Sequence, residues 1–325
     1  MNRSVFLGVL GVTVGLYACG GDTDVTLGTD SGTDTGTLPD TGNPPPNDSG
    51  VIDTGTPPPD DASADAIVPI PDSGTFSVAT VPGLALWLDA NKGVTQSTGK
   101  VSGWADQSGN NNNAAQSNAA NRPGFTASAL NSLPGVHFDM NVAGGTFMTI
   151  VDATTLNWAT GDYYLVVVAR YSNDPNQQGG FTNRIGAFYF KEGTGPTLGP
   201  ALFGNVTGNP GTSAFATQMS FAAADRLVST STGNNNFPKG HAFSVHRGGT
   251  TLELRNNGAL DGTKTVTAVD VSAPTIDVML GATPGNGFTQ NRLNGDIAEV
   301  IAVKGAISSG DLSGIEGYLK AKYAL

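Results

Sequence analysis

Side chains that could carry out acid–base chemistry are sparse in this chain of 325 residues. A glycosidase could place two carboxyls at alternate positions of one strand, where both would face the scissile bond. None of the four glutamates has a second Glu or an Asp at that spacing. Asp296 and Glu299 are three residues apart and would face opposite sides of an ideal strand. A carboxylate pair assembled from distant strands therefore stays open as an alternative. These glutamates are Glu192, Glu253, Glu299 and Glu316.

The three histidines, His137, His241 and His246, are scattered, with no metal-ligand spacing and no nucleophile motif beside them. Glu299 shares its expected strand face with Ile297 and Ile301. It is predicted to be a half-buried partner for an arginine, with a groove-lining role as the alternative.

Asp106, Ser108 and Asn110 follow one another in a Gly- and Asn-rich stretch. Short oxygen-bearing side chains favour turns because they bond their own backbone. This pattern predicts a turn closed by Asp106, and a ligand-binding loop built on the same three residues is the alternative.

Tryptophan rings can stack on sugars, and Trp158 is the best candidate for an exposed ring. Trp87 lies in an apolar strand and Trp104 opens a turn, so core packing is expected for both. No basic stripe with interleaved aromatics occurs, which argues against nucleic acid as a partner.

Cys19 is the only cysteine, and it follows a basic start and an apolar run. The run, Val5–Leu16, is shorter than the roughly 20 residues that span a bilayer and suits a signal peptide. Leu16-Tyr17-Ala18-Cys19 resembles the bacterial lipobox, which implies a signal peptide over residues 1–18 and acylation of Cys19. Gly20, by resemblance to Gram-negative lipoproteins, implies the outer membrane. A plain secreted protein is the alternative.

Residues 19–76 are predicted to form a disordered tether. From residue 20 the segment is rich in Gly, Thr, Asp, Ser and Pro, with 11 Asp and no Lys or Arg. It cannot bury enough apolar surface to offset its ordering entropy. The remaining residues hold 15 Lys and Arg against 16 Asp and Glu, so the chain's acidity belongs to the tether.

Residues 77–325 are predicted to form one all-β domain, a two-sheet antiparallel jelly-roll sandwich with one short C-terminal helix. Arg255-Asn256-Asn257-Gly258 predicts a hairpin. Ser308 is expected to cap the helix, with Leu312, Ile315, Leu319 and Tyr323 on its apolar face. The expected strands are Leu84–Leu88, Gly135–Phe138, Tyr163–Tyr171, Ala187–Phe190, Ala242–His246, Thr251–Leu254, Ile276–Leu280 and Ile297–Val303.

Motifs at both ends of this domain resemble the laminin-G-like, concanavalin A-like modules of bacterial surface proteins. They are Gly83–Ala90, Val101–Asn110, Asn121-Arg122-Pro123, Pro134–Asp139, Gly295–Ile301 and Ile315–Tyr323. The resemblance implies two antiparallel sheets, frequent carbohydrate or protein recognition, and, in some relatives, calcium. Here Asp106 would be the calcium ligand, with backbone carbonyls completing the site.

The leading functional hypothesis is a non-catalytic recognition module, exported and lipid-anchored to the cell envelope, that binds a glycan or a surface protein. A glycan hydrolase or lyase with a dispersed site is the second hypothesis. A structural surface protein without a dedicated ligand is the third.

Overall fold

The computed structural model describes residues 76–172, 186–191, 199–204, 215–218, 226–228, 239–267, 269–273, 275–284 and 292–325. Cys19, the predicted signal peptide and the predicted tether up to residue 75 lie outside these residues. Within the described ranges, no helix has the length and apolar content needed to cross a membrane.

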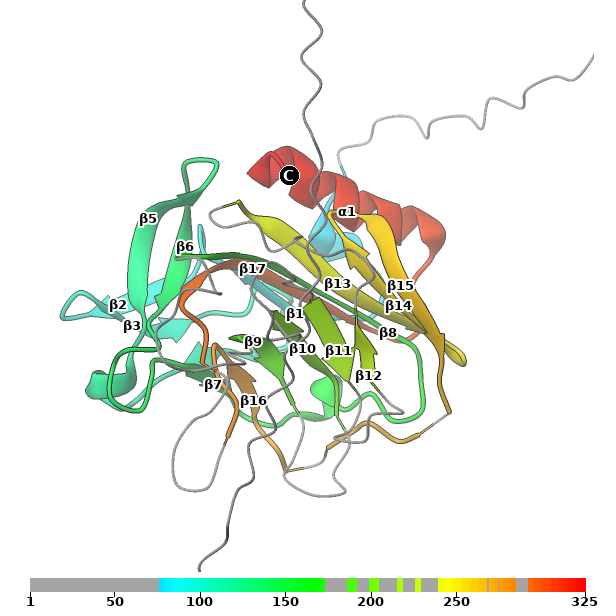
Figure 1. Ribbon diagram of the computed structural model, residues 1–325, viewed down its shortest axis with the longest axis horizontal. Helices are drawn as coiled ribbons and strands as arrows, with labels where there is room; N and C mark the ends of the chain where they lie inside the picture. Colours follow the sequence, from blue (N-terminus) through cyan, green and yellow to red (C-terminus); the bar gives the residue numbers. More distant parts are fainter. Residues whose placement is uncertain are drawn as a thin grey trace, which may run out of the picture. The chain divides into compact units, whose positions relative to one another are not determined.

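The described residues form two antiparallel sheets and one α-helix, so the predicted all-β sandwich with a C-terminal helix is confirmed (Figure 1). Sheet A has the order β15-β14-β13-β8-β17-β6-β5, and β1 pairs with β17 beside β6. Its strands are β1 (Leu84–Asp89), β5 (Gly124–Leu130), β6 (Leu133–Phe138), β8 (Tyr163–Tyr171), β13 (His241–Gly248), β14 (Thr251–Asn256), β15 (Ala259–Thr265) and β17 (Gly295–Lys304).

Sheet B has the order β12-β11-β10-β9-β16-β7-β4-β3-β2. Its strands are β2 (Val94–Ser97), β3 (Lys100–Trp104), β4 (Ala114–Ala115), β7 (Met148–Ile150), β9 (Gly186–Phe190), β10 (Ala201–Gly204), β11 (Phe215–Gln218), β12 (Arg226–Val228) and β16 (Val278–Leu280). Three short 3-10 helices complete the described elements: η1 (Val78–Thr80), η2 (Ala119–Asn121) and η3 (Thr154–Leu156).

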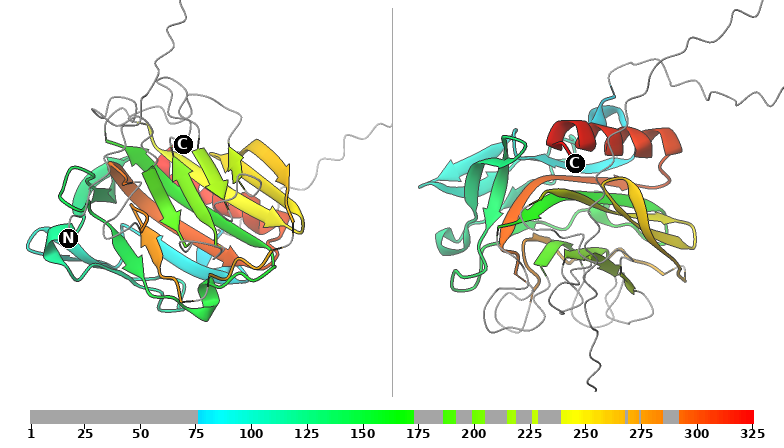
Figure 2. Two further views of the ribbon diagram at one scale, coloured as in Figure 1. Left: turned by 60° about the horizontal axis from the view of Figure 1, so that its bottom comes forward. Right: turned by 45° about the horizontal axis from the view of Figure 1, so that its top comes forward.

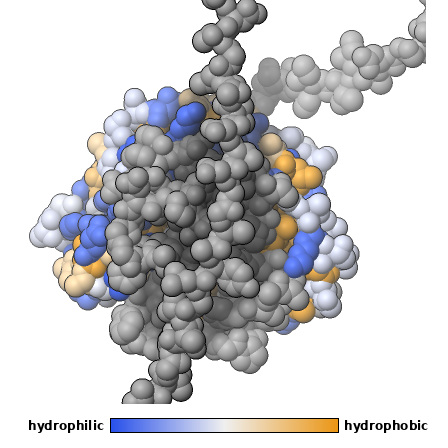
Figure 3. Space-filling view, viewed as in Figure 1, coloured by the Kyte–Doolittle hydropathy of each residue, from blue (hydrophilic) through white to orange (hydrophobic). Residues whose placement is uncertain are grey.

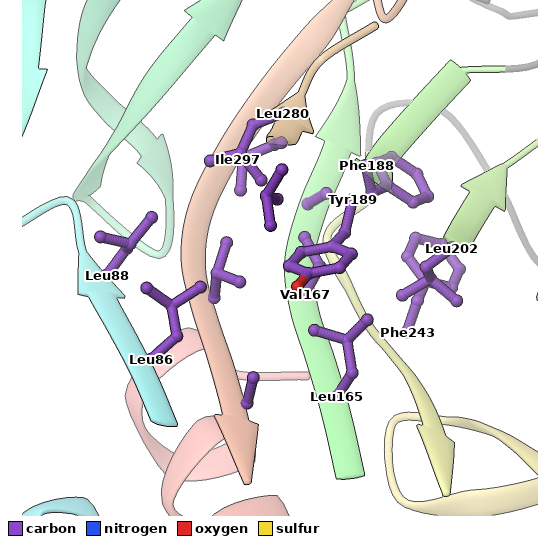
Figure 4. Close-up of a cluster of buried hydrophobic side chains, with 14 of the residues drawn as sticks. Leu86, Leu88, Leu165, Val167, Phe188, Tyr189, Leu202, Phe243, Leu280 and Ile297 are labelled. Atoms are coloured by element: carbon purple, nitrogen blue, oxygen red, sulfur yellow. The ribbon is translucent and has the colours of Figure 1, made fainter. Parts of the chain in front are cut away.

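The main core lies between the sheets, where side chains from both interdigitate (Figure 4). Leu165 and Val167 from β8 face Phe188 and Tyr189 from β9 across this layer. A second apolar layer lies between sheet A and α1 (Ser309–Tyr323), which covers the outer face of that sheet (Figure 2). Because both faces of β8 and β17 are covered, these strands read as continuous apolar runs rather than alternating ones.

Local signals in the sequence predicted several elements correctly. β14 and β15 are joined at Asn257 and Gly258, whose positive φ angles of 49° and 76° suit a two-residue hairpin turn. The hydroxyl oxygen of Ser308 accepts a hydrogen bond from the Asp311 backbone N–H (3.0 Å), so this residue caps α1 as expected.

The sequence-based prediction lacks strands β2, β3, β4, β5, β7, β10, β11, β12 and β15. They are short, or their side chains are largely exposed, as in β2, where no residue is buried. An exposed strand lacks the apolar alternation that identifies a half-buried one.

Candidate binding groove

A groove of about 390 Å³ lies at the start of β1 among the described residues, within the size range of about 300–1,000 Å³ typical of small-molecule sites. It draws together segments that are far apart in the chain: the entry to β1, the loop after β3, η3 and the end of β17. Its lining consists of Gly83, Leu84, Ala85, Asn110, Thr154, Thr155 and Lys304.

Gly83 brings the entry of β1 against the end of β17. Its φ is +76°, and a Cβ at this position would lie 2.2 Å from the carbonyl oxygen of Lys304. The Lys304 N–H donates to the carbonyl oxygen of Gly83 at 2.8 Å. Only glycine combines this conformation with so close an approach, and Lys304 is thereby placed beside the groove.

The loop after β3 is held against β1 by the carboxylate of Asp106, which accepts four hydrogen bonds. One oxygen accepts from the backbone N–H groups of Trp87 (2.9 Å) and Ser108 (2.9 Å). The other accepts from the Ser108 hydroxyl (2.7 Å) and the Asn112 N–H (2.9 Å). Asp106 and Ser108 therefore connect the turn to the strand, in the arrangement that the turn interpretation predicts.

Amide side chains of the same loop satisfy carbonyl groups of β1. Asn110 donates to the carbonyl oxygen of Leu84 at 2.9 Å, and Asn112 donates to that of Ala85 at 2.8 Å. A strand with unpaired backbone groups invites pairing with another chain, so this loop also protects β1.

A turn closed by Asp106 is favoured over calcium binding there, because a cation would have to displace donors that already bond to the carboxylate. No group of three or more His, Cys, Asp or Glu that could hold a metal ion occurs among the residues described.

The groove offers four polar groups to a ligand. The exposed Lys304 ammonium donates one hydrogen bond, to the carbonyl oxygen of Thr154 at 2.9 Å. The Thr155 hydroxyl oxygen accepts from Asn112 at 2.9 Å, which leaves its hydrogen to donate. The Thr154 hydroxyl is exposed, and no described donor bonds to the side-chain oxygen of Asn110. The lining residues therefore carry two hydroxyls, one amide oxygen and one ammonium that can bond to a ligand.

The expectation that Trp158 is exposed is not met. The side chain is 2% exposed and packs in the main core, with its ring centroid 5.7 Å from that of Tyr163. The turn at η3 directs both Leu156 and Trp158 inward, while Thr154 and Thr155 border the groove. Of the residues predicted to bind ligand, Asn110 alone lines the groove. Nothing in the sequence pattern marked the two threonines or Lys304.

Glu299 does pair with a basic group, but the partner is Lys322 rather than an arginine. Asp89 and Glu299 are opposite each other on β1 and β17, and the Lys322 ammonium binds both carboxylates, at 2.9 and 2.8 Å. The two carboxylates are 2% and 1% exposed beneath α1. Burial raises the pKa of Glu299, and attraction to Lys322 offsets only part of this effect. The fold thus joins two distant carboxyls, but it covers them, so a glycosidic bond has no access to them.

A bulge in β17 overturns the expected side-chain directions. The register shifts between Ile297 and Glu299, so Ile297 packs in the main core while Glu299 lies beneath α1 with Ile301. Asp296 lies on the same outer side of the sheet as Glu299, not on the opposite side, as its ion pair with Arg170 shows. An extra residue at a bulge reverses the alternation of an ideal strand.

Asp296 is the centre of a separate outer cluster. Its carboxylate binds Arg170 (2.9 Å), Thr126 (2.7 Å) and His137 (3.1 Å) and is 1% exposed. Burial would raise the pKa of Asp296, but the hydrogen bonds from His137, Thr126 and Arg170 outweigh it and hold that pKa below its ordinary value. This cluster joins β5, β6, β8 and β17 and lies outside the groove lining.

The described surface offers little for apolar docking. Blue and orange residues are interspersed around the face drawn in Figure 3. Among the residues described, Val151 and Leu260 are the large hydrophobic residues with exposed side chains, at 72% and 55%.

No family model and no curated protein matches the chain. Among solved structures, it is similar to the binding domain of Paraclostridial Mosquitocidal Protein 1, with 10% identity and a TM-score of 0.50. That match covers 75% of this chain and 53% of the other, so it spans about half of that longer chain.

Two further similarities are to domains of carbohydrate-active enzymes. Domain 4 of AbnA, an extracellular arabinanase from Geobacillus stearothermophilus solved with arabinotriose, is 11% identical, with a TM-score of 0.45 and coverage of 73% of this chain and 99% of that one. The CBM40 of the Ruminococcus gnavus IT-sialidase, bound to α2,3-sialyllactose, is 15% identical, with a TM-score of 0.37 and coverage of 49% and 83%. At such a low identity, the similarity to the binding domain of Paraclostridial Mosquitocidal Protein 1 supports the sandwich fold alone.

Proposed function

We propose that this chain is a non-catalytic glycan-binding module displayed on the cell envelope. The observation that carries the proposal is the chemistry of the groove at the start of β1. Hydroxyls, an amide oxygen and an ammonium line it, and these groups match the donors and acceptors of sugar hydroxyls.

The described residues that line the groove support a binding role over hydrolysis. Among them there is no carboxylate, histidine or cysteine. The carboxyls of Asp89 and Glu299, which neighbouring strands bring together, are sealed beneath α1. A hydrolase needs two carboxyls flanking the bond that it cleaves.

A glycan array probed with the full chain tests this proposal. Thr154→Val removes one groove hydroxyl with little change of shape, and Thr263→Val makes the same change on the exposed face of β15. We expect the groove variant to weaken glycan binding by about three- to tenfold, the loss of one hydrogen bond, while the control variant binds normally. Absence of binding to any glycan, equal effects of the two variants, or release of reducing ends would contradict the proposal.

We further propose that a lipid on Cys19 anchors the chain and that the acidic segment after it holds the module away from the membrane. The lipobox-like sequence before Cys19 supports the first part, and the composition of residues 20–75 supports the second. Metabolic labelling with a palmitate analogue should label the wild type but not Cys19→Ser, since only sulfur accepts the lipid. Equal labelling of both would contradict the anchor.

A further inference from the structure

We infer that the groove at the start of β1 binds a sugar that bears a carboxylate. This inference rests on the proposed glycan-binding function and narrows its ligand class. Among the described residues that line the groove, Lys304 is the charged one, and none is acidic. A ligand with one negative charge therefore meets an attractive group and no repulsive one.

Lys304 is held in place on two sides. Its backbone N–H donates to the carbonyl oxygen of Gly83, and its ammonium donates to that of Thr154, both within 2.9 Å. An ammonium has three hydrogens, so two remain for a ligand. Because the hydrogen bond to Thr154 fixes the side chain at the groove, less rotamer entropy is lost when a ligand binds.

The charge of Lys304 is not neutralised by the residues described. Lys191 pairs with Asp152, and Lys322 pairs with Asp89 and Glu299. Lys304 forms no ion pair within 4 Å among the described residues. A ligand carboxylate would form an ion pair with Lys304 through charge-assisted hydrogen bonds, which are about twice as strong as neutral ones.

The remaining lining favours an acidic sugar over a simple anion. The side-chain oxygen of Asn110 is an acceptor, and a simple carboxylate offers no donor to it. The hydroxyls of Thr154 and Thr155 can either donate or accept. A ligand that neutralises the ammonium and also donates to the amide oxygen must carry a negative charge and a hydroxyl donor, as a sugar acid does.

The experiment compares matched pairs of glycans on one array, probed with the full chain. Each acidic glycan (polygalacturonate, alginate, hyaluronan and sialyllactose) is printed beside its carboxyl-reduced form, together with neutral glycans. We expect the tightest ligand to be acidic and to lose about tenfold or more in affinity on reduction, the loss of one charge-assisted contact.

Three variants locate the effect. Lys304→Gln should weaken binding of the acidic form by about tenfold without affecting the reduced form, and Lys304→Arg should retain most of the binding. Lys100→Gln, at an exposed lysine of the β2–β3 hairpin, is the matched control and should bind as the wild type does.

The outcomes separate the two proposals. If glycans bind but the neutral or reduced forms bind equally well, the acidic-sugar inference is wrong and the glycan-binding function stands. If Lys100→Gln weakens binding as much as Lys304→Gln, the attraction is nonspecific and the inference is again wrong. If no glycan on the array binds, both proposals are wrong.

Discussion

Two carboxylates in this protein are bonded so completely by the fold that their roles are structural. Asp106 accepts four hydrogen bonds from its own loop and from β1. Glu299 also accepts four, from the side chains of Trp87, Tyr318, Lys322 and Tyr323. Such charge-assisted contacts stabilise the positions of β1 and α1, and they leave few lone pairs for substrate or metal.

Replacing Asp106 by alanine should destabilise the domain by about 2–3 kcal/mol, because the Trp87 and Asn112 N–H groups lose their acceptor. Asp270→Ala, at an exposed loop aspartate bonded to Ser272, should cost under about 1 kcal/mol. Denaturant unfolding measures both costs.

Adding calcium or a chelator should leave the melting temperatures of the wild type and the Asp106 variant unchanged. A calcium-dependent rise that the Asp106 variant abolishes would instead identify a cation site.

Asp296 should make stability depend on acid pH. The pKa of this buried carboxyl in the folded state lies below its ordinary value of 3.8, so its contribution is present above that value and is lost as the pH falls through the folded pKa. At pH 7, Asp296→Asn should cost about 2–3 kcal/mol, the range for hydrogen bonds to a charged group. Urea unfolding from pH 7 to pH 2 should show the wild type and the variant converging below about pH 4. A difference that stays constant would contradict this assignment.

At the scale of the elements, α1 depends on docking rather than on its own propensity. It contains Gly310, Gly314 and Gly317, each of which costs about 1 kcal/mol relative to alanine. Close packing explains why position 314 is a glycine, because a Cβ there would lie 2.4 Å from the Phe76 ring. The helix is therefore stabilised by the apolar layer that it forms with sheet A.

Leu319→Ala should cost about 2–5 kcal/mol, because the side chain is 1% exposed in this layer and its removal leaves a cavity. Lys320→Ala is the neighbouring control. Its side chain is exposed, so the cost should be under about 0.5 kcal/mol. Unfolding by denaturant compares the two, and similar costs would mean that the helix is not docked in solution.

At the scale of the whole molecule, Phe76, which stands at the end of the predicted tether, packs with residues of the predicted domain. Phe76 is partly buried and belongs to the apolar layer beneath and around α1. The chain that enters the domain and the helix that ends it are therefore packed together. A truncation that removes Phe76 would remove part of this layer.

A chain that lacks residues 1–75 should melt at the same temperature as the full chain, because the acidic segment has no aromatic residue and is dominated by Gly, Thr, Asp, Ser and Pro. Phe76→Ala in the shortened chain should lower the melting temperature by several degrees, since a loss of about 1–2 kcal/mol corresponds to about 2–4 °C per kcal/mol at this size. Ser77→Ala, at an exposed position, is the control. A large drop on removal of residues 1–75 would show that this segment packs on the domain.

The sequence by itself determined the fold class, the central strands and the terminal helix. These depend on local information: the long apolar runs of β8 and β17, the Asn-Gly turn after β14, and the Ser308 cap of α1. Each signal involves only a few neighbouring residues and does not depend on which distant segments they contact.

Only the tertiary structure decided which side chains meet. The bulge in β17 arises from its pairing with β8, and it turned Asp296 and Glu299 to the same face. Trp158 is buried because η3 turns it inward, and Lys304 reaches Thr154 because Gly83 admits a close approach. Residues 83, 110, 154 and 304 line one groove although they are far apart in the sequence. Register, bulges and close approaches depend on the partner strand, which no local pattern specifies.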